Sequence, residues 1–339
     1  MQTLLKTVTP ARRKIMIPIL LQGHTRPITD LTYNRDGDIL VTAAKDETPN
    51  VWWCHNGERL GTLDGHNGAV WTVKISGDST MVASGSADNT VRLWDLATGK
   101  CLHELNFDTA VRSLDFSMGD RQIAIITDAT MGRPSTVHIF DLSSPENAVL
   151  SIKAAEDSSK KANVCAWTDC NERILTGHQN GDLCLWEPKM GSMVLSKSGA
   201  SAHTDAVRDI QFSADLSYFI TASKDQSAKI FDADTLDCLK TLNTERPVNS
   251  ASISPLRDEV ILAGGQEALH VTTTSSRAGQ FEARFFHPAL EVEIGRVRGH
   301  FGPINKVKYS PSGRGYASGA EDGYVRLHTF DPDYFDFMP

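Results

Sequence analysis

Long apolar runs are missing from this chain of 339 residues. A helix needs about 20 consecutive, mostly apolar residues to cross a bilayer, and no run of even 18 occurs here. A membrane-spanning helix is therefore not predicted. An excess of positive charge is missing as well, because 34 Lys and Arg residues stand against 42 Asp and Glu residues, for a net charge of −8. This balance argues against a general electrostatic attraction to nucleic acid.

Cysteine is scarce and irregularly spaced, at or near predicted strands for the most part. We expect the six thiols to be reduced, small core residues of an intracellular protein. Cys165 and Cys170 together with His178 suggest zinc, but there is no second C-x-x-C pair, so neither a metal ion nor a cofactor is predicted. The six residues are Cys54, Cys101, Cys165, Cys170, Cys184 and Cys238.

A four-residue pattern recurs along the chain. A histidine is followed 22 residues later by an aspartate, with a hydroxyl side chain four residues before that aspartate and a large ring six residues after it. Four occurrences of one register indicate that a single supersecondary unit is repeated. In order of histidine, hydroxyl, aspartate and ring, the sets are His24, Thr42, Asp46 and Trp52; His66, Ser84, Asp88 and Trp94; His203, Thr221, Asp225 and Phe231; and His300, Ser318, Asp322 and His328.

The second copy, residues 65–102, shows what the unit is. Its short apolar runs are separated by Ser-Gly-Asp-Ser, Ala-Asp-Asn and Ala-Thr-Gly turns, which predicts a four-stranded antiparallel meander. These residues resemble the WD40 repeat, with the dipeptides Gly65-His66 and Trp94-Asp95, so an all-β propeller is implied. The intervals of 42, 137 and 97 residues between the four histidines correspond to one, three and two repeats. With the last repeat, seven blades are expected.

Three of these blades are expected to be degenerate and therefore less rigid. Blade three begins near residues 109–111 and ends at 137–141, with an insertion at 131–135. Blade four covers residues 177–186 and has Asn180 where the aspartate is expected. In blade six, Glu267 takes the aspartate position and Thr273 the ring position.

The repeated set also has the composition of a hydrolase triad, as in Ser84, His66 and Asp88. A hydrolase needs that set once, beside an oxyanion hole, whereas here it is repeated and its hydroxyl and ring vary. We therefore interpret it as a hydrogen-bond relay within each blade, since buried polar groups must satisfy one another.

The two ends of the chain differ from the repeats. Residues 1–16 hold four basic residues and no acidic one, which is faintly like a transit peptide; we favour a disordered basic extension. The propeller is assigned to residues 17–339. The β-like run at 17–21 precedes the first blade, and we expect it to supply the outer strand of the last blade and close the ring.

Segments that depart from the generic repeat carry a closer resemblance, which covers nearly the whole propeller. They look like subunit I of eukaryotic translation initiation factor 3. The segments are residues 34–38, 56–62, 224–232, 244–251, 264–268, 271–275, 281–287, 299–305 and 322–326.

This resemblance implies a cytoplasmic, non-catalytic scaffold that supports mRNA recruitment and scanning on the small ribosomal subunit. Its implied partners are a C-terminal helical segment of the B subunit and the N-terminal region of the G subunit. The B segment is expected on blades five and six, where Asp209 and Asp225 match the family's acids, with Arg208 and Lys224 alongside. Asp209 is taken as a surface residue, so that Asp209→Lys is expected to leave folding intact.

For two aromatic segments the sequence leaves two roles open. Residues 277–298 are expected to form the fourth strand of blade six and a linker, or else a second docking ledge; most of the aromatics Phe281, Phe285 and Phe286 are expected in the core. The aromatic tail at 334–337 either packs under blade seven or awaits a partner.

Other functions are less well supported. A kinase-receptor-associated WD40 adaptor shares the repeat and some of the segments. An enzyme acting at the central channel would need a phosphate-binding glycine loop, H-E-x-x-H or a nucleophile beside a base, and none is found. Sequence-specific RNA binding would need a basic stretch with aromatics, which is also missing.

Overall fold

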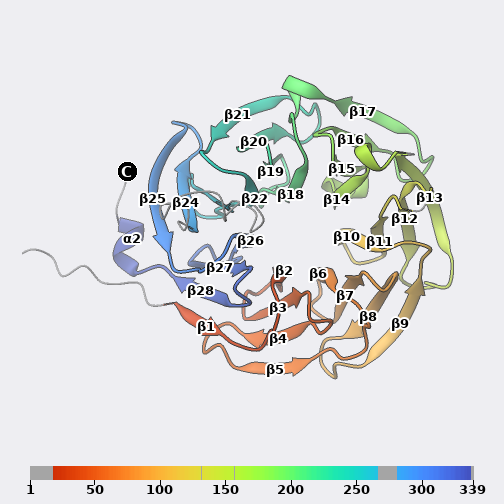
Figure 1. Cartoon of the computed structure of the whole chain (residues 1–339), viewed down its shortest axis with the longest axis horizontal. Coiled ribbons are helices and arrows are strands. Elements are labelled where there is room, and N and C mark those ends of the chain that lie inside the picture. The colour runs from red at the N-terminus through yellow and green to blue at the C-terminus, as the bar shows by residue number, and fades with distance from the viewer. Residues whose placement is uncertain (1–17, 131, 156, 266–280, 337–339) are drawn as a thin grey trace, which may run out of the picture.

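Seven four-stranded antiparallel sheets are arranged in a ring in the computed structural model (Figure 1). The structure describes residues 18–130, 132–155, 157–265 and 281–336. Successive strands of each sheet run from the central channel outward, so that the predicted seven-bladed propeller is confirmed. Within the described ranges, no helix has the length and apolar character needed to cross a membrane.

Every blade is a meander of consecutive strands except the last, which takes its outer strand from the N-terminus. Blade one is β2 (Ile28–Tyr33), β3 (Ile39–Ala44), β4 (Asn50–Trp53) and β5 (Arg59–Thr62); blade two is β6 (Val70–Ile75), β7 (Met81–Ser86), β8 (Thr90–Asp95) and β9 (Cys101–Asn106). Blade three is β10 (Val111–Phe116), β11 (Gln122–Thr127), β12 (Ser135–Asp141) and β13 (Ala148–Ala155); blade four is β14 (Ala162–Trp167), β15 (Ile174–His178), β16 (Leu183–Trp186) and β17 (Met193–Lys197). Blade five is β18 (Val207–Phe212), β19 (Tyr218–Ser223), β20 (Ser227–Asp232) and β21 (Cys238–Asn243); blade six is β22 (Val248–Ile253), β23 (Val260–Gly264), β24 (Glu282–His287) and β25 (Val292–Arg298). Blade seven is β26 (Ile304–Tyr309), β27 (Gly315–Ala320), β28 (Val325–Thr329) and β1 (Ile19–Leu21), and the helical turns are η1 (Ser158–Lys160), η2 (Asp169–Asn171), η3 (Gly199–Ser201) and α2 (Pro332–Asp336).

The ring is closed by the two ends of the chain. Strand β1 pairs antiparallel with β28, with Ile19 opposite Leu327 and Leu21 opposite Val325. Leu21 is buried in a cluster that also holds residues of blade one. The expected closure by the N-terminal strand is therefore confirmed, and β1 covers the edge of β28 that would otherwise be free.

The innermost strand of every blade carries a β-bulge directly after its first residue. In blade two, for example, Val70 pairs with Ser86 and the next paired residue is Thr72, so that Trp71 is left out of the ladder. A bulge adds a residue to one strand and re-aims its side chain. The seven bulge residues are Thr29, Trp71, Arg112, Asn163, Arg208, Asn249 and Asn305.

Neighbouring blades pack face to face, and three second-strand glycines show how closely. A Cβ atom built on Gly85 would lie 2.5 Å from Val111, the first residue of the next inner strand. Gly177 has the same relation to Val207, at 2.7 Å, and Gly319 to Ile28, at 2.6 Å. Any larger side chain at these glycines would push two blades apart, because the neighbour is a buried branched residue.

The structure corrects the assignment of blade six. Its third strand is β24, paired with β23 through Val260 opposite Phe286, so residues 277–298 are not a fourth strand and linker. Phe286 takes the ring position, which Trp94 occupies opposite Val82 in blade two. The predicted positions Glu267 and Thr273 lie outside the described residues. Phe281, Phe285 and Phe286 are buried, as expected.

The aromatic tail packs against the propeller. Tyr334 in α2 stacks on Phe330 with ring centroids 4.4 Å apart, and the Arg257 guanidinium lies 4.8 Å from the Tyr334 ring. The Tyr334 hydroxyl donates a hydrogen bond to Glu259. The tail is thus anchored between blades six and seven. Phe337 lies outside the described residues.

The cysteines are only partly as predicted. All six are free thiols. Cys165 and Cys184 are buried, and burial raises the pKa of each thiol to about 12. The prediction of core positions is wrong for Cys101, Cys170 and Cys238, which are exposed. Among the described residues, no group of three or more His, Cys, Asp or Glu side chains is arranged to hold a metal.

Candidate functional site

The second blade contains a complete hydrogen-bond relay. The His66 ring lies 2.9 Å through Nδ1 from the Asp88 carboxylate and 2.7 Å through Nε2 from the Ser84 hydroxyl. The Trp94 indole N–H donates to the same hydroxyl at 2.8 Å, and Asp88 also accepts from the Asn67 backbone N–H. These distances fit a neutral imidazole that donates from Nδ1 and accepts at Nε2. Every polar group of the set therefore has a partner.

Three further blades repeat this relay. The Nε2 atoms of His24, His203 and His300 lie 2.7, 2.7 and 2.8 Å from the hydroxyls of Thr42, Thr221 and Ser318. Their Nδ1 atoms lie 3.0, 2.8 and 3.0 Å from Asp46, Asp225 and Asp322. The four histidine and hydroxyl positions predicted from the 22-residue spacing come together in the structure.

The ring position is less uniform than the rest of the relay. Trp52 donates to Thr42 at 2.9 Å, as Trp94 does to Ser84. Phe231 has no N–H and makes an edge contact with His203, with ring centroids 6.1 Å apart. His328 stacks on Tyr316 at 4.5 Å, and its buried Nδ1 has no hydrogen-bond partner among the described residues. Burial, with His300 and Arg326 nearby, lowers the pKa of His328 to about 4.

Blade four contains a shortened relay that the spacing rule missed. Thr176 occupies the hydroxyl position, and the Trp186 indole donates to it at 2.8 Å. The histidine comes from the end of β15 instead of the preceding loop: His178 Nε2 lies 2.9 Å from the Thr176 hydroxyl and its Nδ1 2.8 Å from the Lys160 carbonyl. The sequence did contain a signal for this relay: a hydroxyl residue stands ten residues before a tryptophan, as it does in blades one and two.

Blade three replaces the relay by apolar packing. Ile125, opposite Leu114, takes the position that Ser84 holds opposite Val73 in blade two. Phe107 packs edge-on against Phe140 at 5.8 Å, much as His66 packs against Trp94 at 6.1 Å. An aromatic ring thus takes the place of the relay histidine without its polar groups.

The relay carboxylates are held in the charged form. Burial opposes the charge of Asp88, but hydrogen bonds from Thr90, Asn67 and His66 outweigh it and lower the pKa of Asp88 to about 2. The balance is the same at Asp322, where the bond from His300 lowers the pKa to about 2. Burial also lowers the pKa of the His66 imidazole. The relay therefore pairs a carboxylate with a neutral histidine near pH 7.

Burial of the hydroxyls decides against catalysis by these sets. Thr42, Ser84 and Thr221 are 0% exposed and Ser318 is 1% exposed. A nucleophile must reach a substrate carbonyl, and these oxygens lie inside the sheets, each hydrogen-bonded to the histidine of its own blade. The chemistry that this arrangement supports is hydrogen bonding within a blade.

The Asp209 side chain is inside the molecule, contrary to the prediction of a surface residue. It is 2% exposed, on the inner strand of blade five. Its carboxylate accepts hydrogen bonds from Lys306 at 2.8 Å, from Ser250 at 2.5 Å and from Gln211 at 3.0 Å. Burial opposes its charge, but Lys306 and these bonds outweigh it and lower the pKa of Asp209. The sequence missed this because the partners Ser250 and Lys306 lie on other blades, at no spacing that the repeat predicts.

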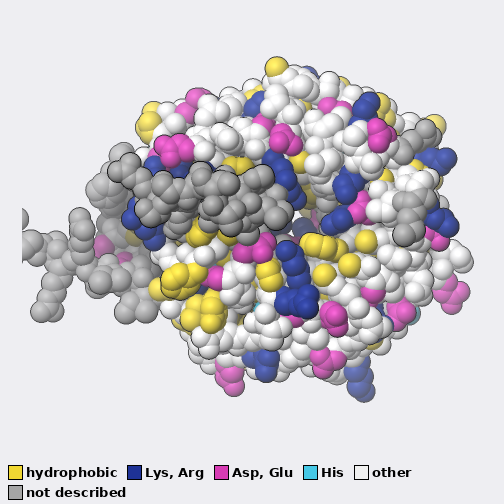
Figure 2. Space-filling view, in the orientation of Figure 1, with side chains coloured by type: hydrophobic (Ala, Val, Ile, Leu, Met, Phe, Trp, Pro, Cys, Tyr) yellow, Lys and Arg dark blue, Asp and Glu magenta, His cyan; other side chains and the backbone are white. Residues whose placement is uncertain are grey.

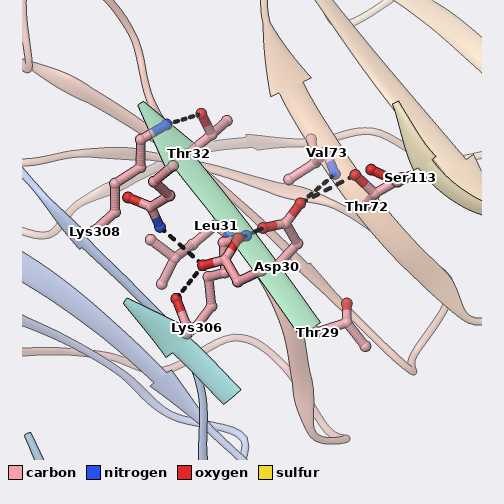
Figure 3. A network of polar contacts seen from close by, with 12 residues as sticks. Thr29, Asp30, Leu31, Thr32, Thr72, Val73, Ser113, Lys306 and Lys308 are labelled. Atoms are coloured by element: carbon pink, nitrogen blue, oxygen red, sulfur yellow. Dashed lines mark hydrogen bonds and ion pairs between the residues drawn. The ribbon is translucent and has the colours of Figure 1, made fainter. Parts of the chain in front are cut away.

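Through Lys306, Asp209 belongs to a network of charged side chains on the inner strands of several blades, part of which is drawn in Figure 3. Lys306 Nζ also lies 3.2 Å from Asp30, whose other oxygen accepts from the Thr72 hydroxyl and the Val73 N–H, both at 3.1 Å. These contacts connect blades one, two, five and seven, and Ser250 adds blade six. Nearby, Lys308 donates to Thr32 at 3.3 Å, and burial beside Lys74 and Lys306 lowers the pKa of Lys308 to about 8.

The other three predicted docking residues surround the end of the same blade. Val207 pairs with Ser223, which brings the start of β18, with Arg208, next to the end of β19, after which Lys224 and Asp225 follow. Arg208 is exposed and Lys224 half-buried. The Asp225 side chain is only 9% exposed, because it serves the relay of blade five.

Comparison with known proteins identifies related chains along nearly the whole length. A family model described as EIF3I matches residues 16–339. Relatives called eukaryotic translation initiation factor 3 subunit I include those of Xenopus tropicalis, 51% identical over 95% of this chain and 99% of the relative, and Nematostella vectensis, 49% identical over 95% and 98%. The relative from Botryotinia fuckeliana is 49% identical over 95% of this chain and 97% of its own.

Proposed function

Because this chain belongs to the family of subunit I of eukaryotic translation initiation factor 3, we propose that it acts as a non-catalytic scaffold of that factor. Membership makes it a translation initiation factor subunit. In the proposed role it holds other subunits together and so supports mRNA recruitment and scanning on the small ribosomal subunit. Membership also favours this function over that of a receptor-associated adaptor.

The observation that carries the scaffold role is that the histidine, hydroxyl and aspartate of each four-residue relay bond to one another within their own blade. The four relay hydroxyls are at most 1% exposed, and the channel charges are paired with one another. Rigid blades with satisfied interiors leave the surface loops as the means of interaction. This supports binding, not turnover, as the function.

We place the docking of the B subunit's C-terminal helical segment on the surface of blade five. Lys224 and Arg208 offer charged side chains there, and Asp225 adds a carboxylate that the relay holds in place. Asp209 contacts Lys306 inside the channel and is not part of this surface. The N-terminal region of the G subunit is the second proposed partner, on a surface of the propeller that we do not assign.

The test compares the same substitution in two relays. Asp225→Asn in blade five and Asp88→Asn in blade two each weaken one histidine contact of nearly equal length, 2.8 and 2.9 Å. Affinity for the isolated B segment is measured by titration calorimetry, with unfolding curves for both variants. We expect a loss of about tenfold or more for Asp225→Asn alone, since a rim charge has been removed from the contact.

Wild-type affinity of both variants for the B segment would exclude a direct role for Asp225. An equal loss of affinity in both variants would mean that relay stability, and not the docking contact, controls binding. Lys224→Glu tests the half-buried cation beside Asp225, with Lys189→Glu in the exposed turn of blade four as its control.

We further propose that the protein acts in the cytoplasm and binds no specific nucleic acid on its own. The net charge of −8 supports this, because phosphate contacts depend on clustered Lys and Arg. Filter binding of the chain to single-stranded RNA at low salt tests it; sequence-dependent retention would contradict it.

A further inference from the structure

The inner strands of the blades carry three lysines whose charges act on one another: Lys74 in blade two and Lys306 and Lys308 in blade seven. Lys306 and Lys308 stand two residues apart on β26, so their side chains leave the strand on the same side. Lys74 and Lys308 hold the same place in their blades, as the fifth residue of β6 and of β26. All three residues are half-buried, so none of the amines is surrounded by water as a surface lysine is.

Two of these amines have carboxylate partners. The Lys306 amine lies 2.8 Å from Asp209 and 3.2 Å from Asp30. The Lys74 amine lies 3.1 Å from Asp115. In these places the attraction of an opposite charge compensates a cation for the water that it has lost.

Lys308 is the lysine of this group without an ion pair. Among the described residues its amine donates one hydrogen bond, to the Thr32 hydroxyl at 3.3 Å (Figure 3), and no carboxylate lies within ion-pair distance. The oxygens of Asp30 are already occupied, one by Lys306 and the other by donors of blade two. A charged Lys308 is therefore a half-buried cation beside two others, with no anion of its own.

This arrangement disfavours the charged form of the amine. Burial and the charges of Lys74 and Lys306 lower the pKa of Lys308 to about 8, although Asp30 and Asp115 oppose them. Burial and a neighbouring cation are the conditions that activate lysine as a nucleophile, because only the uncharged amine has a free electron pair. At pH 7 about one molecule in ten has this amine uncharged, against roughly one in 2,500 for an ordinary lysine of pKa 10.4.

We propose that Lys308 is an acylation site, at which the amine accepts an acyl group from a thioester. The amine nitrogen attacks the thioester carbonyl carbon, a C–N bond forms, and the C–S bond breaks with its electron pair on sulfur. The proton lost by the nitrogen ends on the thiol. The product is a neutral amide, so the uncompensated charge is removed. The amide N–H keeps a donor for Thr32, and the new carbonyl oxygen offers Lys74 an acceptor.

Acylation fits this amine better than other modifications of lysine do. Methylation keeps the positive charge that the site disfavours. Addition of CO2 would replace that charge by a negative one near Asp30 and Asp115. Many other amines compete for the donor, since Lys and Arg side chains stand out at several places on the surface (Figure 2). Selectivity for Lys308 thus comes from its charge state and not from its exposure.

The test is competitive labelling of the folded full-length chain at pH 7 with a small thioester, S-acetyl-N-acetylcysteamine. The chain is then unfolded, the remaining amines are acetylated with deuterated acetic anhydride, and the isotope ratio at each lysine is measured by peptide mass spectrometry. We expect Lys308 to be labelled about tenfold or more faster than Lys189, in the exposed turn of blade four. Its rate should level off above pH 8, whereas the rate of an ordinary lysine of pKa 10.4 keeps rising.

A neighbouring substitution shows whether the charges are the cause. Lys74→Gln removes one of the two repelling cations, so we expect Lys308 to be labelled more slowly at pH 7. Asp115 still accepts from the Trp167 backbone N–H in this variant, so its carboxylate keeps a partner. Lys189→Gln is the control, and we expect it to leave the labelling of Lys308 unchanged.

A second measurement does not depend on access of the reagent. The folded-state pKa of Lys308, about 8, lies below the unfolded value of about 10.4, so the charged amine destabilises the folded chain below pH 8. Lys308→Gln, with an uncharged amide like the product, is therefore expected to raise the midpoint of thermal unfolding at pH 7. Lys306→Gln should lower it, because Asp209 and Asp30 lose their cation.

Several results would overturn the proposal, which does not rest on the proposed scaffold role. They are labelling of Lys308 no faster than that of Lys189, a rate that keeps rising through pH 9, and an unchanged rate in Lys74→Gln. A lower midpoint of thermal unfolding for Lys308→Gln would overturn it as well, since the charged amine would then stabilise the fold.

Discussion

The relays within the blades and the charge network in the channel solve the same problem in opposite ways. Both bury polar side chains and satisfy them. A relay such as that of His66, Ser84 and Asp88 closes within one sheet and contains one carboxylate and a neutral histidine. The channel network of Asp30, Asp209 and Lys306 joins different blades and contains full charges of both signs.

The relays therefore stabilise single blades, whereas the channel network stabilises the packing of blades against each other. A relay can be exchanged for apolar contacts, as blade three does with Ile125 and Phe107, because nothing outside the blade depends on it. A channel charge has partners on other blades, so its loss leaves a buried opposite charge uncompensated. We therefore expect the loss of a charge from the channel network to destabilise the protein more than the loss of a relay residue.

The largest effect is expected from Asp209→Lys. The new ammonium would face Lys306, with Lys74 and Lys308 close by, in place of the carboxylate that Lys306 now binds at 2.8 Å. Breaking a buried pair in this way costs about 3–5 kcal/mol. Urea unfolding followed by tryptophan fluorescence is expected to show a strongly destabilised chain.

Asp209→Asn serves as the matched variant, because it keeps the shape and a hydrogen-bond acceptor for Ser250. We expect Asp209→Asn to lower the free energy of unfolding clearly less than Asp209→Lys does. An unfolding midpoint of Asp209→Lys equal to that of the wild type would mean that the channel network does not hold the blades together.

An intermediate effect is expected from Asp88→Ala, which removes one relay carboxylate. The unpaired donor of His66 costs about 1–3 kcal/mol at pH 7. The folded-state pKa of Asp88, about 2, lies below its unfolded value of about 3.9. Its contribution is therefore complete above pH 4 and is lost as the pH falls toward 2, so the difference from the wild type should shrink over that window.

The control for this series is Asp36→Ala, at an exposed turn of blade one. We expect its free energy of unfolding to match that of the wild type at every pH. A wild-type midpoint for Asp88→Ala in thermal unfolding would exclude the relay as a source of stability.

The smallest effect is expected from Trp94→Phe, which gives blade two the ring that blade five has naturally in Phe231. Only the indole hydrogen bond to Ser84, at 2.8 Å, and a little volume are lost, while His66 still bonds to that hydroxyl. We expect the free energy of unfolding to fall by about 0.5–1.5 kcal/mol. A loss as large as that of Asp88→Ala would show that the indole, and not the carboxylate, anchors the relay.

The same division explains what the sequence could predict. Relay residues stand at fixed spacings within one repeat, so counting from His24, His66, His203 and His300 located them and the blade number. The channel contacts join residues such as Asp209 and Lys306, which no repeat spacing relates. Alternation along a strand marks its two faces, but it does not tell which residues of the neighbouring blades those faces meet.

Degenerate blades limited the prediction in a second way. In blade six the third strand follows a long connection, so counting six residues from Glu267 placed the ring at Thr273 and not at Phe286. In blade four the histidine is contributed by β15 itself, and a rule that requires it in the preceding loop overlooks His178. Residues that bind partners could be predicted only from the family resemblance, because such residues follow no regular spacing in a single sequence.

The pairing of β1 with β28 sets the order of events when the protein is made. Ile19 leaves the ribosome long before its partner Leu327, so the seventh blade cannot complete itself until β28 has emerged. Until then the first blade lacks its neighbour and the nascent ring has open edges, the kind of exposure that favours aggregation. Bringing such distant segments together also slows folding, because the entropy of closing the loop is lost before the contact forms. The contacts that close the ring can therefore form only after β28 has been synthesised.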